Sequence, residues 1–113
     1  MLRVVWNGLR HFVATEHSWR FHAVAVVLII GAGLALDFTA SDWRWVILGF
    51  AIIWIAEALN TAVERLGDAV APARNKAVGL AKDIAASAVF IAIMAASLIG
   101  VSLFLPHLVD LVD

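Results

Sequence analysis

The apolar positions of this chain fall into one periodic segment and three nearly continuous runs. In residues 1–18, apolar side chains recur at intervals of three or four, at Leu2, Val5, Trp6, Leu9 and Val13. This spacing is typical of an amphipathic helix that lies in a membrane surface. The three later runs, residues 19–36, 45–64 and 84–105, are each about as long as a bilayer crossing requires. The pattern predicts a surface helix followed by three transmembrane helices.

Composition supports an integral membrane protein with all-α structure. Of the 113 residues, 64% are hydrophobic and only 15% are charged, whereas soluble domains average roughly 45–50% and about 25%. We therefore expect a single membrane domain with no separate soluble part. The chain has no cysteine, which excludes disulfides and thiolate chemistry. Its net charge of −1 argues against nucleic acid as a partner.

The positions of Lys and Arg predict the orientation in the membrane. One group precedes the first run or lies at its start, namely Arg3, Arg10 and Arg20. Another lies in the polar connection 65–83, namely Arg65, Arg74, Lys76 and Lys82, and only Arg44 lies between the first and second runs. Basic residues favour the cytoplasmic side of a membrane. We expect the N-terminus and the 65–83 connection to be cytoplasmic and the C-terminus to lie outside.

The second run ends in a stripe of polar side chains. Glu57, Asn60, Thr61 and Glu64 are spaced i, i+3, i+4 and i+7, so they share one side of a helix with 3.6 residues per turn. A charge within a bilayer costs at least about 2.5–3.5 kcal/mol on insertion scales. An acidic residue there is accordingly a hypothesis for a functional site.

Two kinds of chemistry use such a stripe. Carboxylates beside Lys and Arg at the cytoplasmic face suit a magnesium–nucleotide complex, because Mg²⁺ prefers oxygen ligands and phosphate prefers cations. Glu57 lies about 10 Å deeper than Glu64, where a poorly solvated carboxylate accepts a proton from a lipid hydroxyl. The residues alone leave open a membrane-embedded transferase and a non-enzymatic oligomer, either a structural subunit or a proton or cation conduit. Residues 45–56 are wholly apolar, which disfavours a conduit.

Two segments resemble the signature of the prokaryotic diacylglycerol kinase family, which includes undecaprenol kinases. They are E-A-L-N-T-A-V-E, beginning at Glu57, and A-K-D-I-A-A-S-A-V, beginning at Ala81. W-N-G-L-R, ending at Arg10, and Glu16 before Trp19 are similar to the family's surface helix and its end. No Walker or Rossmann glycine pattern is present.

The resemblance implies a small homotrimer of the bacterial cytoplasmic membrane with active sites shared between subunits. It implies transfer of the γ-phosphate of ATP, bound with Mg²⁺, to the hydroxyl of a membrane lipid. Glu57 matches the catalytic base and Asn60 the amide beside it. Glu16 and Glu64 match the carboxylates that hold magnesium. The implied nucleotide-binding residues are Glu16, Glu64, Asp68, Lys82 and Asp83. We also expect Arg10 to contact the nucleotide, since Arg3 or Arg10 could substitute for basic residues that family members carry farther upstream.

The resemblance leaves two lipid acceptors. Diacylglycerol, which would give phosphatidic acid, is the acceptor that we expect first. Undecaprenol is the alternative, because Glu16 with R-F-H after Trp19, and the F-L-P segment ending at Pro106, are similar to the polyprenol kinase branch.

Overall fold

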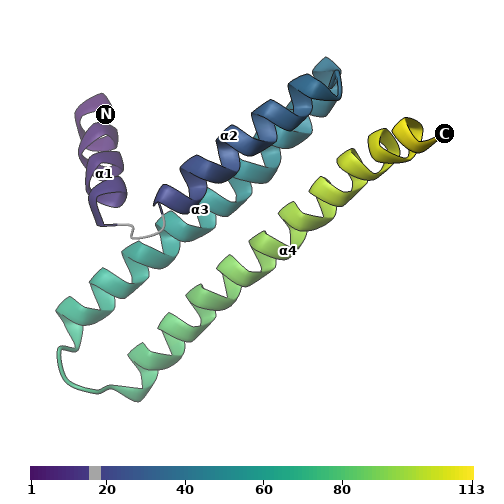
Figure 1. Cartoon of the computed structure of the whole chain (residues 1–113). Coiled ribbons are helices and arrows are strands. Elements are labelled where there is room, and N and C mark those ends of the chain that lie inside the picture. Colours follow the sequence, from purple (N-terminus) through teal and green to yellow (C-terminus); the bar gives the residue numbers. More distant parts are fainter. Residues whose placement is uncertain (16–18) are drawn as a thin grey trace. The chain divides into compact units, whose positions relative to one another are not determined.

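The computed structural model describes residues 1–15 and 19–113, and this part of the chain is helical throughout apart from short connections. Its helices are α1 (Leu2–Thr15), α2 (Trp19–Ala35), α3 (Ala40–Val70) and α4 (Lys76–Val112), as Figure 1 shows. They form two compact units, Met1–Phe38 and Thr39–Asp113, which are described separately below. The all-α prediction is confirmed.

The first unit contains α1 and α2. α1 is amphipathic, as its spacing predicted, and exposes large apolar residues such as Trp6. α2 begins with Trp19 and Arg20, whose guanidinium carbon lies 5.5 Å from the centre of the Trp19 ring. α2 ends in a Schellman motif: the Phe38 N–H donates to the Gly33 carbonyl at 2.9 Å, and Asp37 has a positive φ of 55°. Asp takes the left-handed conformation more readily than most residues other than Gly.

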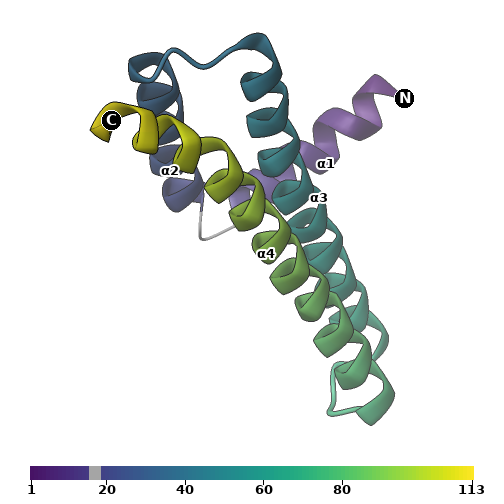
Figure 2. The ribbon, with the colours of Figure 1, turned by 90° about the vertical axis from the view of Figure 1, so that its right-hand side faces the viewer.

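The second unit is an antiparallel hairpin of α3 and α4, which lie side by side in Figures 1 and 2. Small residues bring the two backbones together. Gly49 on α3 and Ala92 on α4 are buried, and a Cβ added to Gly49 would lie 3.9 Å from the Ala96 Cβ. Helices in lipid associate by this kind of close packing, because lipid provides no hydrophobic force between them.

The connection between α3 and α4 is shorter than the polar segment 65–83. α3 continues to Val70, where the Ala71 N–H donates to the Gly67 carbonyl, and α4 begins at Lys76. Asn75 caps α4, because its side-chain oxygen accepts from the backbone N–H groups of Ala77 and Val78 at 3.0 and 3.1 Å. Such a cap satisfies donors that have no partner within the helix. Only residues 71–75 are non-helical here.

α4 also runs past the predicted end of its apolar segment. The sequence places the end of the third run at Pro106, but the helix continues to Val112. Proline in a helix removes one backbone hydrogen bond, and a helix within a membrane protein tolerates this loss when neighbouring groups compensate. The continuation brings His107 beside the first turn of α3, where it contacts Asp42.

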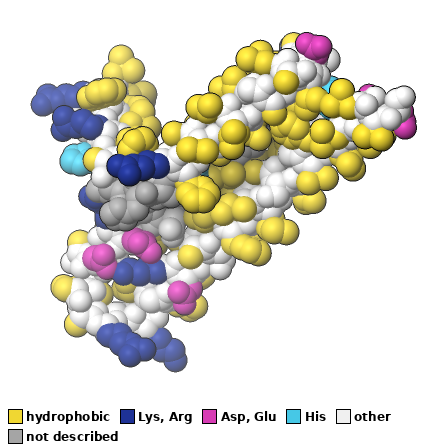
Figure 3. Space-filling model, in the orientation of Figure 1, with side chains coloured by type: hydrophobic (Ala, Val, Ile, Leu, Met, Phe, Trp, Pro, Cys, Tyr) yellow, Lys and Arg dark blue, Asp and Glu magenta, His cyan; other side chains and the backbone are white. Residues whose placement is uncertain are grey.

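α3 and α4 are long and apolar enough to cross a membrane, and a third crossing is present if the bent pair α1 and α2 counts as one span. α3 has 31 residues and α4 has 37, so they are roughly 46 and 55 Å long. Both exceed the hydrocarbon thickness of about 30 Å, so their charged ends lie outside that layer. Figure 3 shows acidic and basic side chains together near the loop that joins α3 and α4.

Candidate functional site

α3 presents five polar side chains along one side. Glu57, Asn60, Thr61 and Glu64 have the predicted spacing, and Asp68 follows one turn later in the same unbroken helix. Glu57 and Asn60 are half-buried, whereas Glu64 and Asp68 are exposed. The stripe therefore changes from sheltered to exposed as α3 approaches the loop.

The sheltered part of the stripe contains two buried oxygen atoms. Oε2 of Glu57 and Oδ1 of Asn60 are both inaccessible to solvent. Among the described residues, nothing donates a hydrogen bond to Oδ1 of Asn60. A buried acceptor without a donor costs about 1–3 kcal/mol. A bound molecule with a hydroxyl group could recover part of this free energy.

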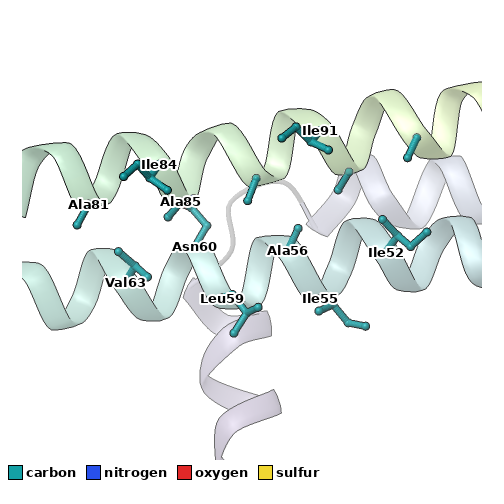
Figure 4. Close-up of a pocket in the computed structure, with 13 residues that line it drawn as sticks. Ile52, Ile55, Ala56, Leu59, Asn60, Val63, Ala81, Ile84, Ala85 and Ile91 are labelled. Atoms are coloured by element: carbon teal, nitrogen blue, oxygen red, sulfur yellow. The ribbon is translucent and has the colours of Figure 1, made fainter.

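Asn60 borders an apolar groove between α3 and α4. The groove has a volume of about 690 Å³, and Asn60 is the single polar residue among the thirteen that line it. Figure 4 shows Asn60 extending from α3 toward α4, with Val63 and Ala81 near one end of the groove and Ile52 near the other. Alanines on α4 leave this space open because their side chains are short.

The exposed part of the stripe is connected to α4 by an ion pair. The Lys82 Nζ lies 2.5 Å from the Asp68 Oδ1. The hydrogen bond to Asp68 raises the pKa of Lys82, and the negative charges of Asp68 and Glu64 act in the same direction. Lys82 is therefore a cation at neutral pH with two carboxylates near it. This combination of charges suits a phosphate group accompanied by a metal ion.

Gly67 is a feature of this cluster that sequence reasoning missed. A Cβ at this position would lie 2.9 Å from the Val78 Cγ1 and 3.0 Å from the Lys82 Cε. The absence of a side chain therefore lets the Lys82 stem pass close to α3 on its way to Asp68. The signal in the sequence was a glycine inside a helical pattern, which often marks close packing.

The other predicted site residues are not all brought together. Asp83 is exposed, and its backbone carbonyl accepts a hydrogen bond from the Ser87 hydroxyl at 2.9 Å. Thr61 is half-buried on α3. Arg10 is exposed on α1, in the other unit. Glu16 lies outside the described residues. Its predicted role and that of Arg10 stay predictions.

The carboxylates at the exposed end of the stripe are compatible with a metal ion that is also bound by phosphate oxygens. In residues 1–15 and 19–113, no group of three or more His, Asp or Glu side chains gathers as a metal site. Glu64 is the exposed carboxylate nearest the Asp68–Lys82 pair along the stripe. Magnesium commonly takes only one or two protein carboxylates and completes its coordination with water and phosphate oxygens. Glu64 fits that pattern.

Comparison with known proteins shows the family of this chain. Residues 3–104 match the family model described as prokaryotic diacylglycerol kinase. The chain is 34% identical over 110 residues to a diacylglycerol kinase of Synechocystis. The aligned residues make up 96% of this chain and 63% of that protein. It is 30% identical over 106 residues to an undecaprenol kinase of Bacillus subtilis, and the aligned residues make up 94% of this chain and 83% of that protein.

A third relative is the diacylglycerol kinase of Escherichia coli, which is 34% identical over 91 residues, 80% of this chain and 75% of that protein. The chain thus spans less than two thirds of the Synechocystis protein but most of the other two. The matches include both motifs, the α3 stripe and the start of α4. This chain belongs to the prokaryotic diacylglycerol kinase family, a family of lipid kinases.

Proposed function

We propose that this protein transfers the γ-phosphate of ATP to the hydroxyl group of a membrane lipid in a magnesium-dependent reaction. The first acceptor to consider is diacylglycerol, which would become phosphatidic acid. Undecaprenol is the alternative acceptor, and relatives named for each lipid are similar to this chain. Both reactions use the same bond changes at an alcohol oxygen.

The observation that supports this proposal best is that the polar side chains along α3 change from half-buried at Glu57 and Asn60 to exposed and charged near the loop. The buried oxygens of Glu57 and Asn60 lie two turns or less from Glu64, and the Asp68–Lys82 ion pair follows one turn later. A lipid hydroxyl stays near the membrane surface, and a nucleotide approaches from water. A stripe that is sheltered at one end and charged at the other suits the meeting of these two substrates.

Glu57 acts as the general base in this proposal. Its carboxylate accepts the proton of the lipid hydroxyl as the hydroxyl oxygen forms a bond to the γ-phosphorus. The bond between that phosphorus and the oxygen bridging to the β-phosphate breaks, and ADP leaves. General base catalysis typically contributes roughly 10²- to 10⁴-fold in rate, and phosphoryl transfer otherwise depends mainly on positioning and charge stabilisation.

Asn60 orients the acceptor. Its buried Oδ1 lies one turn from Glu57 and beside the apolar groove, so it can accept a hydrogen bond from a polar group of the lipid. This contact would hold the reacting hydroxyl near the Glu57 carboxylate. Correct orientation of reacting groups is a large part of catalysis in phosphoryl transfer.

The charged end of the stripe binds the nucleotide. Lys82 contacts phosphate oxygens, and Asp68 keeps the ammonium group pointed toward α3. Glu64 and Glu16 are the carboxylates that would hold magnesium, which neutralises charge on the phosphate oxygens when it is bound. Asp83 and Arg10 complete the proposed nucleotide contacts.

The proposed membrane arrangement follows from the helices and the basic residues. α1 lies in the membrane surface, and α2, α3 and α4 cross the bacterial cytoplasmic membrane. The N-terminus and the α3–α4 loop are cytoplasmic, and the C-terminus lies outside. The active form is a homotrimer in which neighbouring subunits complete each site.

The proposal is tested by offering radiolabelled ATP and magnesium to the purified protein in micelles that contain either diacylglycerol or undecaprenol. We expect label in one of the two lipids, which identifies the acceptor as well as the reaction. Omission of magnesium should abolish labelling. If neither lipid is labelled by protein that is folded and membrane-inserted, the proposed activity is wrong.

A further inference from the structure

A polar cluster closes the end of the α3–α4 hairpin opposite the loop. The Asp42 Oδ2 accepts a hydrogen bond from the Thr39 backbone N–H at 3.0 Å and lies 3.2 Å from the His107 Nε2. Thr39 Oγ1 in turn accepts from the Asp42 N–H at 3.2 Å. The Asp42 and His107 side chains are only 20% and 26% exposed. The cluster therefore joins two helices through residues 65 positions apart.

Local structure determines the positions of both Asp42 and His107. Thr39 and Asp42 form a capping box at the start of α3, which fixes the direction of the Asp42 side chain. On α4, His107 follows the buried Leu103 by four residues, so the two lie on the same face of the helix. The contact exists because α4 continues as a helix through Pro106.

The cluster and the loop end of the hairpin are too far apart for both to lie within the hydrocarbon layer of a bilayer. Asp42 precedes Asp68 by 26 residues in one continuous helix, which corresponds to roughly 39 Å along its axis. This distance exceeds the hydrocarbon thickness of about 30 Å. In the membrane arrangement proposed above, Asp42–His107 and Asp68–Lys82 are polar pairs near opposite surfaces of the membrane, where each can exchange protons with water.

We propose that Asp42 and His107 form a proton-dependent latch that holds the open ends of α3 and α4 together more tightly when His107 is protonated. A neutral imidazole can donate one hydrogen bond from Nε2, whereas an imidazolium adds a full positive charge opposite the carboxylate. Histidine is the side chain whose charge ordinarily changes between about pH 5 and 8. Mild acidification on this side of the membrane therefore strengthens the latch.

The surroundings favour an ionised Asp42 over this pH range. The Thr39 N–H and, after it, the His107 contacts hold the pKa of Asp42 below its usual range. Among the described residues, the other charged side chains close to these helix ends in sequence are Arg44 on α3, Asp110 and Asp113 on α4, and Asp37 before α3, and all four are exposed. Exposed charges are screened by water and salt. Asp42 therefore presents the negative charge that faces the His107 imidazole.

The latch affects the distance between α3 and α4 beyond the apolar groove. The Lys82–Asp68 pair holds the loop end, where the chain itself already joins the helices. The opposite end has no covalent connection, so the noncovalent contacts there determine how far the helices separate. This inference concerns the hairpin and does not depend on the proposed kinase activity.

The latch is tested by measuring the distance between spin labels on the full-length protein in lipid vesicles. Because the chain has no cysteine, Ser41→Cys with Leu108→Cys labels only the exposed open ends of the hairpin. We expect the separated population to rise on the order of fivefold from pH 5.5 to pH 8, from the usual difference between neutral and charge-assisted hydrogen bonds.

Two variants and a second label pair make the result specific. His107→Gln keeps a hydrogen-bond donor but does not titrate, so its distance distribution should not change with pH. Asp42→Asn keeps an acceptor for the capping box but removes the charge, and provides the same test if His107→Gln does not fold. Labels at Leu66→Cys and Leu80→Cys, near the loop, should show no change. An unchanged distribution at the open end, or an equal response in either variant or at the loop end, would overturn the latch.

Discussion

Lys82 on α4 and Asp68 on α3 form an ion pair with 2.5 Å between Nζ and Oδ1, although they are 14 residues apart in the chain. The pair lies one turn beyond Glu64 and adjacent to Gly67 on α3. The Asp68 side chain is 72% exposed and that of Lys82 31%, and exposed ion pairs contribute little to stability. We therefore expect this pair to contribute little to folding, and we propose that its role is in ligand binding.

Replacement of Lys82 should separate nucleotide binding from stability. We expect Lys82→Gln to raise the KM for ATP at least about tenfold, because a charge-assisted contact to phosphate is lost. Unfolding in denaturing detergent should change little. Lys76→Gln is the matched control, because Lys76 is an exposed lysine in the first turn of the same helix. An equal rise in KM in both variants would contradict the specific role of Lys82.

Gly67→Ala should disturb the same contact from the opposite side. The added Cβ would lie 2.9 Å from the Val78 Cγ1 and 3.0 Å from the Lys82 Cε, so the Lys82 side chain must move. We expect a severalfold higher KM for ATP with little loss of stability, because Ala favours helix over Gly by about 1 kcal/mol. Gly79→Ala is the control, since nothing lies within 4 Å of its added Cβ. Unchanged ATP kinetics in Gly67→Ala would show that the close approach has no functional role.

Glu64→Gln should raise the magnesium concentration needed for half-maximal activity. The amide keeps the size of the side chain but is a weaker ligand for a hard cation than a carboxylate. Magnesium titrations at saturating ATP measure this effect directly, and Glu16→Gln should behave similarly. Asp110→Asn, at the opposite end of the hairpin, provides the control. If the titration curves of Glu64→Gln and Glu16→Gln match that of the unmodified protein, the metal assignment is wrong.

The Asp42 carboxylate should stabilise the hairpin in a pH-dependent manner. The Thr39 N–H and His107 lower the pKa of Asp42 from 3.8, so its stabilising contribution is present above that value and is lost as the pH falls through the lower, folded-state pKa. Unfolding of the unmodified protein and Asp42→Asn should therefore differ near pH 5 and converge in strong acid. A difference of the same size throughout the acid range would exclude this titration.

Much of the fold and part of the site could be predicted from the sequence. The helices follow from apolar runs, and the spacing of Glu57, Asn60 and Glu64 places them on one side of α3. A short connection between two long helices makes an antiparallel hairpin the expected arrangement. The nearness of Asp68 to Lys82 follows from that hairpin, because both residues are close to its loop.

The remaining features depend on contacts between distant segments. The continuation of α4 through Pro106 runs against the local preference of proline, and the Asp42–His107 contact requires that continuation. The role of Gly67 depends on the path of the Lys82 side chain from another helix. A glycine inside a helical pattern indicates close packing, but a single sequence does not report which distant residue makes the contact.

The central claim is that a sheltered carboxylate on α3 accepts the proton of a lipid hydroxyl. The most direct measurement is phosphoryl transfer from radiolabelled ATP to the accepted lipid by the unmodified protein and by Glu57→Gln, at equal amounts of folded, membrane-inserted protein. The account predicts that Glu57→Gln loses roughly 10²- to 10⁴-fold in rate while its unfolding remains similar. A Glu57→Gln protein that labels the lipid as fast as the unmodified protein would contradict it.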